Sequence, residues 1–169
     1  MSPLGKASWL PLGLVALAVI VLDRLSKAIV VRKMAEFQSI PVIPGVFHLT
    51  YVRNPGAAFS LLPDKTGFLV VVGLVVVVGI VVFGPRLVRM GAVYAATLGL
   101  ILGGTLGNLW DRLRGGLVVD FLDLRVWPVF NVADSSLVVG VLILSYLIIR
   151  APDGGPLAGD RPSGGGGET

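Results

Sequence analysis

Aspartate is the residue type in this sequence that best suits paired acid–base chemistry. There is no cysteine and a single histidine, His48, so a thiolate nucleophile and an H-E-x-x-H zinc site are excluded, and a Ser-His-Asp triad would have to use His48. Of the ten acidic residues, three lie in the polar C-terminal segment, and Glu36 and Asp64 have the surroundings of solvated loop residues. The aspartates that remain are Asp23, Asp111, Asp120, Asp123 and Asp134. Two of them, close enough to share one proton, would form a dyad that activates water and polarises a carbonyl group.

Two of these aspartates lie in apolar segments and also have a structural explanation. Asp23 neighbours Arg24 and Lys27, so it can be an interfacial carboxylate that snorkels beside basic side chains. In the segment GNLWDR, Asp111 and Arg112 can form a structural ion pair at a polar helix end. An ionisable group in a membrane helix is nevertheless a functional candidate, because its burial is costly.

Two asparagines precede aspartates by three residues. Asn108 shares one helical face with Asp111 and with the arginine that follows it. Asn131 precedes Asp134 in FNVADSS, where N-capping and the helix dipole explain one of the two residues but do not readily explain both.

The remaining two aspartates stand in the segment LVVDFLDLRV. A strand would direct Asp120 and Asp123 to opposite faces, so only one of them can point at a shared site. Five aspartates give ten possible pairs, and spacing alone does not choose among them.

The elements that must position these residues are membrane helices. Of the 169 residues, 54% are hydrophobic and 14% charged, and the mean hydropathy is +0.88, values typical of a membrane protein. The net charge of +4 comes from scattered basic residues, which excludes a nucleic-acid-binding face. Four apolar stretches approach the ~20 residues that a spanning helix needs: residues 9–30, 67–83, 92–110 and 133–149. The expected fold class is therefore an all-α integral membrane protein with four transmembrane helices.

Four spans would place both termini on one side of the membrane and the first and third loops on the other, which we call the active face. All five candidate aspartates fall on it. Residues 46–52 and 117–126 are rich in β-branched and aromatic side chains and can pair into a small β platform on the membrane surface. Residues 1–150 are expected to form one four-helix domain, and residues 151–169 a disordered tail rich in Gly and Pro.

Two alternatives concern topology. A cleaved signal peptide is one, since Lys6 precedes an apolar run, but no A-x-A site follows and the run continues into Ile29. Orientation is the other question. Five Lys and Arg residues lie on the terminal side, against nine on the active face if Arg24 and Lys27 at the end of the first apolar stretch are counted there. This count opposes cytoplasmic termini, although Arg86 and Arg89 make one short terminal-side loop dense in charge. The charge rule does not decide the orientation.

Four motifs in order resemble one family over nearly the whole chain. These are NPGAAFS, GNLWDR, VVDF and FNVADS, which lie among four hydrophobic spans with Asp23 in the first. Together they closely resemble bacterial lipoprotein signal peptidase, also called signal peptidase II, an aspartyl peptidase family.

The resemblance implies roles for particular residues. It makes Asp120 and Asp134 the catalytic dyad and Asp123 a bystander. It implies that Gly56, Ala57 and Ala58 form a small-residue stretch against which the substrate lies. It also implies polar supports that hold the dyad or bind substrate backbone: Asp23, Asn54, Asn108, Asp111, Arg112 and Asn131.

The resemblance also implies the reaction and its place. The substrate would be a prolipoprotein, cut on the amino side of a diacylglyceryl-modified cysteine, with membrane lipid as the surrounding partner, no metal, no cofactor, no nucleic acid, and a monomer as the active unit. The enzyme would lie in the bacterial inner membrane, with both termini cytoplasmic and the active site on the periplasmic or extracellular side. Pro55 and Leu117 depart from the family pattern, in which Thr or Ser and a histidine are common at these positions. Neither touches the expected dyad.

Two readings from other classes compete with a peptidase. In a proton-coupled carrier, the aspartates would relay ions through the bundle, but the candidates gather on one side of the membrane instead of at several depths. In a membrane scaffold or chaperone, the polar motifs would only cap helices, and Asp120→Asn or Asp134→Asn would leave function largely intact.

Overall fold

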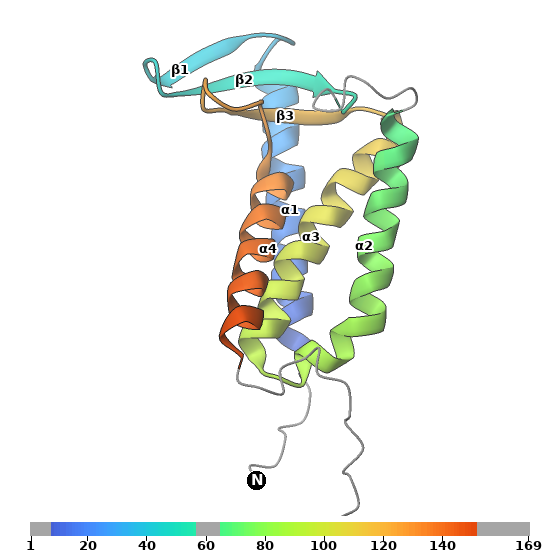
Figure 1. Cartoon of the computed structure of the whole chain (residues 1–169). Helices are drawn as coiled ribbons and strands as arrows, with labels where there is room; N and C mark the ends of the chain where they lie inside the picture. The colour runs from blue at the N-terminus through green and yellow to red at the C-terminus, as the bar shows by residue number, and fades with distance from the viewer. Residues whose placement is uncertain (1–7, 57–64, 152–169) are drawn as a thin grey trace, which may run out of the picture.

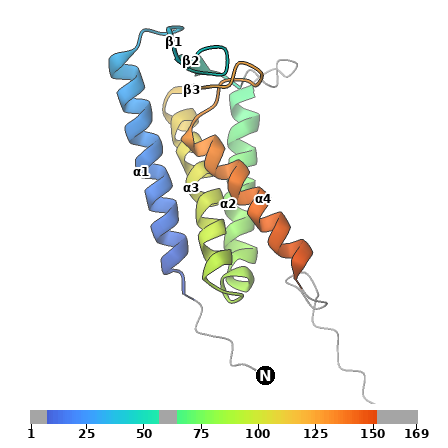
Figure 2. The same cartoon turned by 90° about the vertical axis from the view of Figure 1, so that its left-hand side faces the viewer.

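The computed structural model describes residues 8–56 and 65–151. Four helices lie side by side and a small sheet lies across one end of them (Figure 1). The helices are α1 (Leu10–Lys33), α2 (Lys65–Val88), α3 (Ala92–Gly115) and α4 (Val132–Arg150). The strands are β1 (Ser39–Ile43), β2 (Phe47–Asn54) and β3 (Val118–Asp123). Helix α1 begins and α4 ends away from the sheet (Figures 1 and 2).

Each expected span corresponds to one helix, and the helices extend past the apolar stretches. Helix α3 continues beyond residue 110 through a charged turn and ends at Gly116, which has a positive φ of 72° that glycine adopts without strain. Three helices are long and apolar enough to cross a membrane, with hydropathies of 3.0 for α2, 1.4 for α3 and 2.2 for α4. Helix α1 carries more charge and is not among those three described helices, so four membrane crossings remain a prediction.

Helix α3 is the centre of the bundle and packs against the other three helices. Small residues allow this close approach. A Cβ added at Gly103 would lie only 2.8 Å from the carbonyl oxygen of Ala16 in α1, and one added at Gly104 would collide with the carbonyl oxygen of Ala133 in α4. Helix α2 packs mainly against α3, which leaves space between α2 and α4.

The sheet has the order β1-β2-β3 and both pairings are antiparallel. The expected pairing of the two β-rich loop segments is confirmed by β2 and β3, and its register brings Asn54 beside Val118 and Val52 beside Asp120. Strand β1 was not predicted, because its five residues are all exposed and show no alternating pattern. Buried Tyr51 and Phe121 pack with Val30 of α1 and so fix the sheet to the helix ends.

The expected tail, residues 151–169, lies outside the described residues except for Ala151. The four helices and the sheet fall within the expected domain of residues 1–150. The division into domains remains a prediction.

Candidate active site

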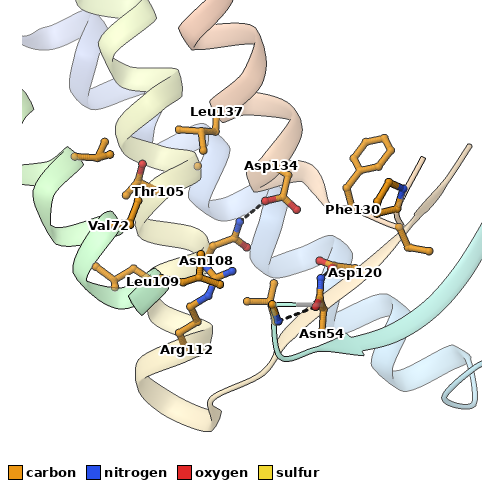
Figure 3. A pocket seen from close by; sticks show the side chains of 18 of the residues that line it. Asn54, Val72, Thr105, Asn108, Leu109, Arg112, Asp120, Phe130, Asp134 and Leu137 are labelled. Atoms are coloured by element: carbon orange, nitrogen blue, oxygen red, sulfur yellow. Dashed lines mark hydrogen bonds between the residues drawn. The ribbon is translucent and has the colours of Figure 1, made fainter. Parts of the chain in front are cut away.

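A cavity of about 370 Å³ opens where α2, α3 and α4 meet the sheet. Its walls from α2 are apolar, whereas its polar side chains come from β2, β3, α3 and the first turn of α4 (Figure 3). Six of the residues predicted for the site line it: Asn54, Gly56, Asn108, Arg112, Asp120 and Asp134. The structure therefore brings together residues from four separate sequence motifs. Ala57 and Ala58 lie outside the described residues.

Asp120 projects from β3 and is only 2% exposed. Its two carboxylate oxygens accept hydrogen bonds from Asn54 Nδ2 and Asn131 Nδ2, each at 2.7 Å. Burial raises the pKa of Asp120 to about 6, and the negative charge of Asp134 acts in the same direction against the opposing effect of the two amides. Asp120 can therefore hold a proton at a pH where an ordinary aspartate has lost it.

Asp134 projects from the first turn of α4 into the same cavity (Figure 3). Its Oδ1 accepts a hydrogen bond of 2.6 Å from Asn108 Nδ2. Its Oδ2 accepts one of 3.2 Å from the backbone N–H of Asn131, and the Asn131 side chain accepts one in return from the Asp134 backbone. This reciprocal capping box corrects the expectation that N-capping would not explain both residues.

Asn131 joins the surroundings of the two aspartates. It is completely buried, and its Nδ2 donates to Asn108 Oδ1 at 3.1 Å as well as to Asp120. N-capping does not require these further contacts. Asn131 therefore also connects the start of α4 to Asn108 of α3 and Asp120 of β3.

The side chains of Asn54, Asn108 and Asn131, which we call the amide layer, neighbour a cluster of charged side chains from α1 and α3. Asp23 is completely buried, pairs with Arg24 and Lys27 at 2.8 Å each, and accepts a hydrogen bond from the backbone N–H of Ala133. It therefore does not snorkel to an interface, which corrects that interpretation. Asp111 pairs with Arg24 and Lys27 as well, so the expected ion pair between Asp111 and Arg112 is also wrong.

Lys27 is the residue that sequence reasoning missed. Its Nζ donates to Asn108 Oδ1 at 3.1 Å, which connects the charge cluster to the amide layer. A lysine four residues after Asp23 in an apolar helix was a possible signal, but its other partners lie more than 80 residues away in the chain.

Arg112 lines the cavity without joining the charge cluster. Across residues 8–56 and 65–151, it takes part in no ion pair. Its guanidinium can therefore offer donors to a bound group in the cavity.

Asp123 and His48 lie away from the cavity. Burial would raise the pKa of Asp123, but hydrogen bonds from Thr50 and from Arg125 outweigh it and hold that pKa below its usual range. The expectation that only one aspartate of β3 points at the site is confirmed. The side chain of His48 contacts Ser39 at 3.1 Å on the sheet. Asp123 lies opposite His48 in the sheet register, but its side chain bonds to Thr50 and Arg125.

Within the described part of the chain, no group of three or more His, Cys, Asp or Glu side chains could hold a metal ion. The cavity instead holds two carboxylates, Asp120 buried and Asp134 partly buried, which accept hydrogen bonds from neutral amides, and Arg112 lines the same cavity. Such a pair can exchange protons with a water molecule and a polarised carbonyl group between them.

Comparison with known proteins agrees with the motifs. The family described as Signal peptidase (SPase) II matches residues 15–150. A lipoprotein signal peptidase of Pelotomaculum thermopropionicum is 47% identical over 135 residues, which cover 80% of this chain and 89% of the relative. One of Halothermothrix orenii is 50% identical, covering 79% and 92%.

A solved structure of a bacterial membrane enzyme, obtained by the in meso method at 1.9 Å resolution, superposes with a TM-score of 0.77. It is 31% identical and the match covers 83% of this chain and 94% of that one. The resemblance that the four motifs predict is confirmed: this chain belongs to the signal peptidase II family.

Proposed function

We propose that this chain is an aspartyl endopeptidase that removes the signal peptide from prolipoproteins, with Asp120 and Asp134 as its catalytic dyad. The observation that carries the proposal is that both carboxylates line one cavity and each accepts a hydrogen bond from an asparagine amide. The names of its relatives support the substrate class.

The reaction follows from the two carboxylates. The raised pKa of Asp120 favours it as the member that carries the proton before attack. Asp134 then takes a proton from water as the oxygen attacks the scissile carbonyl carbon, and Asp120 gives its proton to the carbonyl oxygen. When the tetrahedral intermediate collapses, the C–N bond breaks and the leaving nitrogen takes the proton from Asp134. Asp120 takes back a proton from a hydroxyl group of the intermediate, which becomes the new carboxyl group.

The cavity suits a substrate that stays in the membrane. Leu69, Val72 and Val76 of α2 and Leu137 of α4 give it apolar walls, beside the polar end that carries the aspartates. A peptide bond next to a diacylglyceryl-modified cysteine can therefore lie at the dyad while acyl chains contact apolar side chains. Asn54, Gly56 and Arg112 line the same cavity and are placed to bind substrate backbone.

We further infer that α1 is the fourth membrane crossing, although its composition is more charged than that of the other helices. Its Asp23 and Lys27 are buried against α3, so their charges do not face lipid. Its outer face exposes apolar side chains: Leu14, Leu17, Val21, Leu22, Leu25 and Ile29. We place the chain as a monomer in the inner membrane, with cytoplasmic termini and the sheet on the opposite side.

Cleavage of a diacylglyceryl-modified prolipoprotein by the purified chain in detergent tests the proposal. Asp120→Asn and Asp134→Asn should each lower kcat by about a thousandfold or more while the protein remains folded. Asp123→Asn is the matched control from the same strand as Asp120, and its kcat should stay within about fivefold of wild type, since Asp123 is not at the cavity. Retained activity in either dyad variant, or equal loss in the folded control, would contradict the assignment.

A further inference from the structure

Three asparagine side chains turn their NH₂ groups toward the two carboxylates. Asn54 and Asn131 donate to Asp120 at 2.7 Å each, and Asn108 donates to Asp134 at 2.6 Å. An asparagine side chain ends in an oxygen and an NH₂ group of similar size, so a half turn would place an oxygen against the carboxylate. The direction of each amide must therefore be fixed by the partner of its oxygen.

For two of these asparagines, the partner is a backbone N–H group. Asn54 Oδ1 accepts from the N–H of Gly56 at 2.8 Å, and Asn131 Oδ1 accepts from the N–H of Asp134 at 2.9 Å. A backbone N–H can only donate, so it fixes which end of the amide faces it.

Asn108 lies in the middle of α3, where its oxygen has side-chain partners instead. Its Oδ1 accepts from Lys27 Nζ and from Asn131 Nδ2, each at 3.1 Å. Asn131 Nδ2 also donates to Asp120, and that bond is the shorter of the two at 2.7 Å. The ammonium group of Lys27 has three donors and no acceptor, so it cannot face the NH₂ end of Asn108.

The position of Lys27 is itself fixed. Its side chain is buried, and its Nζ lies 2.8 Å from Asp23 Oδ2 and 2.8 Å from Asp111 Oδ2. With Asn108, the ammonium group has three oxygen partners, two through hydrogen bonds and Asp23 through an ion pair.

We propose that Lys27 is a positioning residue for hydrolysis, which fixes the carbonyl oxygen of Asn108 and so directs the Asn108 amide at Asp134. The proposal rests on the proposed function of Asp134 in the dyad. Without the ammonium group, only the neutral Asn131 amide holds the Asn108 oxygen, so Asn108 can rotate more readily and place its oxygen against the carboxylate. The repulsion would disfavour the ionised Asp134 that must take the proton from water.

Arg24 supplies a matched control. Like Lys27, it pairs with both Asp23 and Asp111, but among the described residues it makes no hydrogen bond to Asn108. Lys27→Met and Arg24→Met therefore each remove one cation from Asp23 and Asp111. Only Lys27→Met also removes the hydrogen bond to the Asn108 side chain.

The test measures kcat and KM for prolipoprotein cleavage, together with the midpoint of thermal unfolding in detergent. Lys27→Met should lower kcat about tenfold to a hundredfold with KM changed less than about twofold, because misdirected groups impair the chemical step more than binding. Arg24→Met should lower kcat by less than about threefold, at a comparable loss of thermal stability. An equal loss of kcat in both variants would overturn the proposal.

A double-mutant cycle separates positioning from a structural role. In the Asn108→Leu background, Lys27→Met should change kcat by less than about threefold, because the amide that it acts on is absent. An undiminished effect in that background would also overturn the proposal. If Lys27→Met does not fold, Lys27→Gln takes its place, since its amide can present either an oxygen or an NH₂ group to Asn108, and it should lower kcat by about fivefold or more.

The same assay keeps the two proposals apart. Loss of kcat in Asp120→Asn and Asp134→Asn with wild-type kcat in folded Lys27→Met would contradict only the positioning role. Retained kcat in the dyad variants would contradict the proposed function, and the positioning role would fall with it.

Discussion

Asp120 and Asp134 accept side-chain hydrogen bonds from neutral amides, and this distinguishes them from Asp23 and Asp111, which lie in ion pairs. Asp23 and Asp111 each contact two basic side chains, whereas each carboxylate of the proposed dyad accepts hydrogen bonds from asparagine. An amide binds a carboxylate in either protonation state, while a contacting cation strongly favours the ionised form. The surroundings of these two residues therefore suit side chains that exchange protons.

The raised pKa of Asp120 predicts a specific dependence of stability on pH. Its pKa is 3.8 in an unperturbed chain and about 6 when folded, so the folded state binds the proton more tightly and loses stability as pH rises between these values. Asp120→Asn removes this titration. From pH 4 to pH 7, the stability of the variant relative to wild type should rise by up to about 3 kcal/mol.

Thermal or chemical unfolding in detergent at a series of pH values measures this difference. Asp123→Asn is the control: because the pKa of Asp123 is lowered from 3.8, the stability of this variant relative to wild type should change little between pH 4 and pH 7 and should rise only as the pH falls below about 4. A pH-independent difference between Asp120→Asn and wild type would contradict the raised pKa.

The sequence predicted the residues that line the cavity better than the residues that hold them in place. Four motifs identified Asn54, Asn108, Asp120 and Asp134, all of which line the cavity. Lys27 was overlooked because a lysine near a helix end is commonly a snorkelling residue, and its contact with Asn108 joins positions 81 residues apart. Such contacts depend on helix packing, which local spacing does not reveal.

At the scale of elements, hydropathy located all four helices, and β-rich composition located two of the three strands. The helix ends were less predictable, since α3 continues through a charged turn that hydropathy does not include. Strand β1 contains Pro41 and has no buried face, so its formation depends on pairing with β2 and not on its own pattern. Alternation of polar and apolar residues predicts only strands that bury one face.

The close contact between α3 and α4 gives a prediction about these elements. A Cβ at Gly104 would collide with the carbonyl oxygen of Ala133 and approach the backbone nitrogen of Leu137 to 3.0 Å. Gly104→Ala should therefore lower stability by about 1–3 kcal/mol through overpacking. It should also lower kcat, because α3 carries Asn108 and α4 carries Asp134.

Gly79→Ala in α2 is the control for Gly104→Ala. No atom lies within 4 Å of a Cβ at Gly79, so this change should be neutral or stabilising by up to about 1 kcal/mol, as alanine favours a helix. The unfolding midpoints of the two variants, measured in the same detergent, test this difference, and that of Gly104→Ala should be the lower. Equal midpoints would show that α3 and α4 are less closely packed than the structure indicates.

For the whole molecule, the fold reduces the number of charges to be counted on the active face but does not decide the orientation. Arg24 and Lys27 were counted among the active-face charges, but both are held in ion pairs inside the bundle. Charges neutralised within a helix bundle do not act on membrane insertion in the way that loop charges do. Omitting them leaves seven basic residues on the active face, from nine less two, against five on the terminal side. The imbalance becomes smaller but does not reverse.

The proposed orientation can be measured directly, because the chain has no cysteine and a single introduced cysteine is a unique label site. Val46 lies between β1 and β2 at the sheet end and is 58% exposed, and Met90 lies between α2 and α3 at the opposite end and is 38% exposed. In bacterial spheroplasts, a membrane-impermeant maleimide should label Val46→Cys, and should label Met90→Cys only after the membrane is permeabilised. Both variants must retain prolipoprotein cleavage for the comparison to hold. Labelling of Met90→Cys alone in sealed spheroplasts would invert the proposed orientation, and labelling of both would mean that the helices between them do not separate the two ends across a membrane.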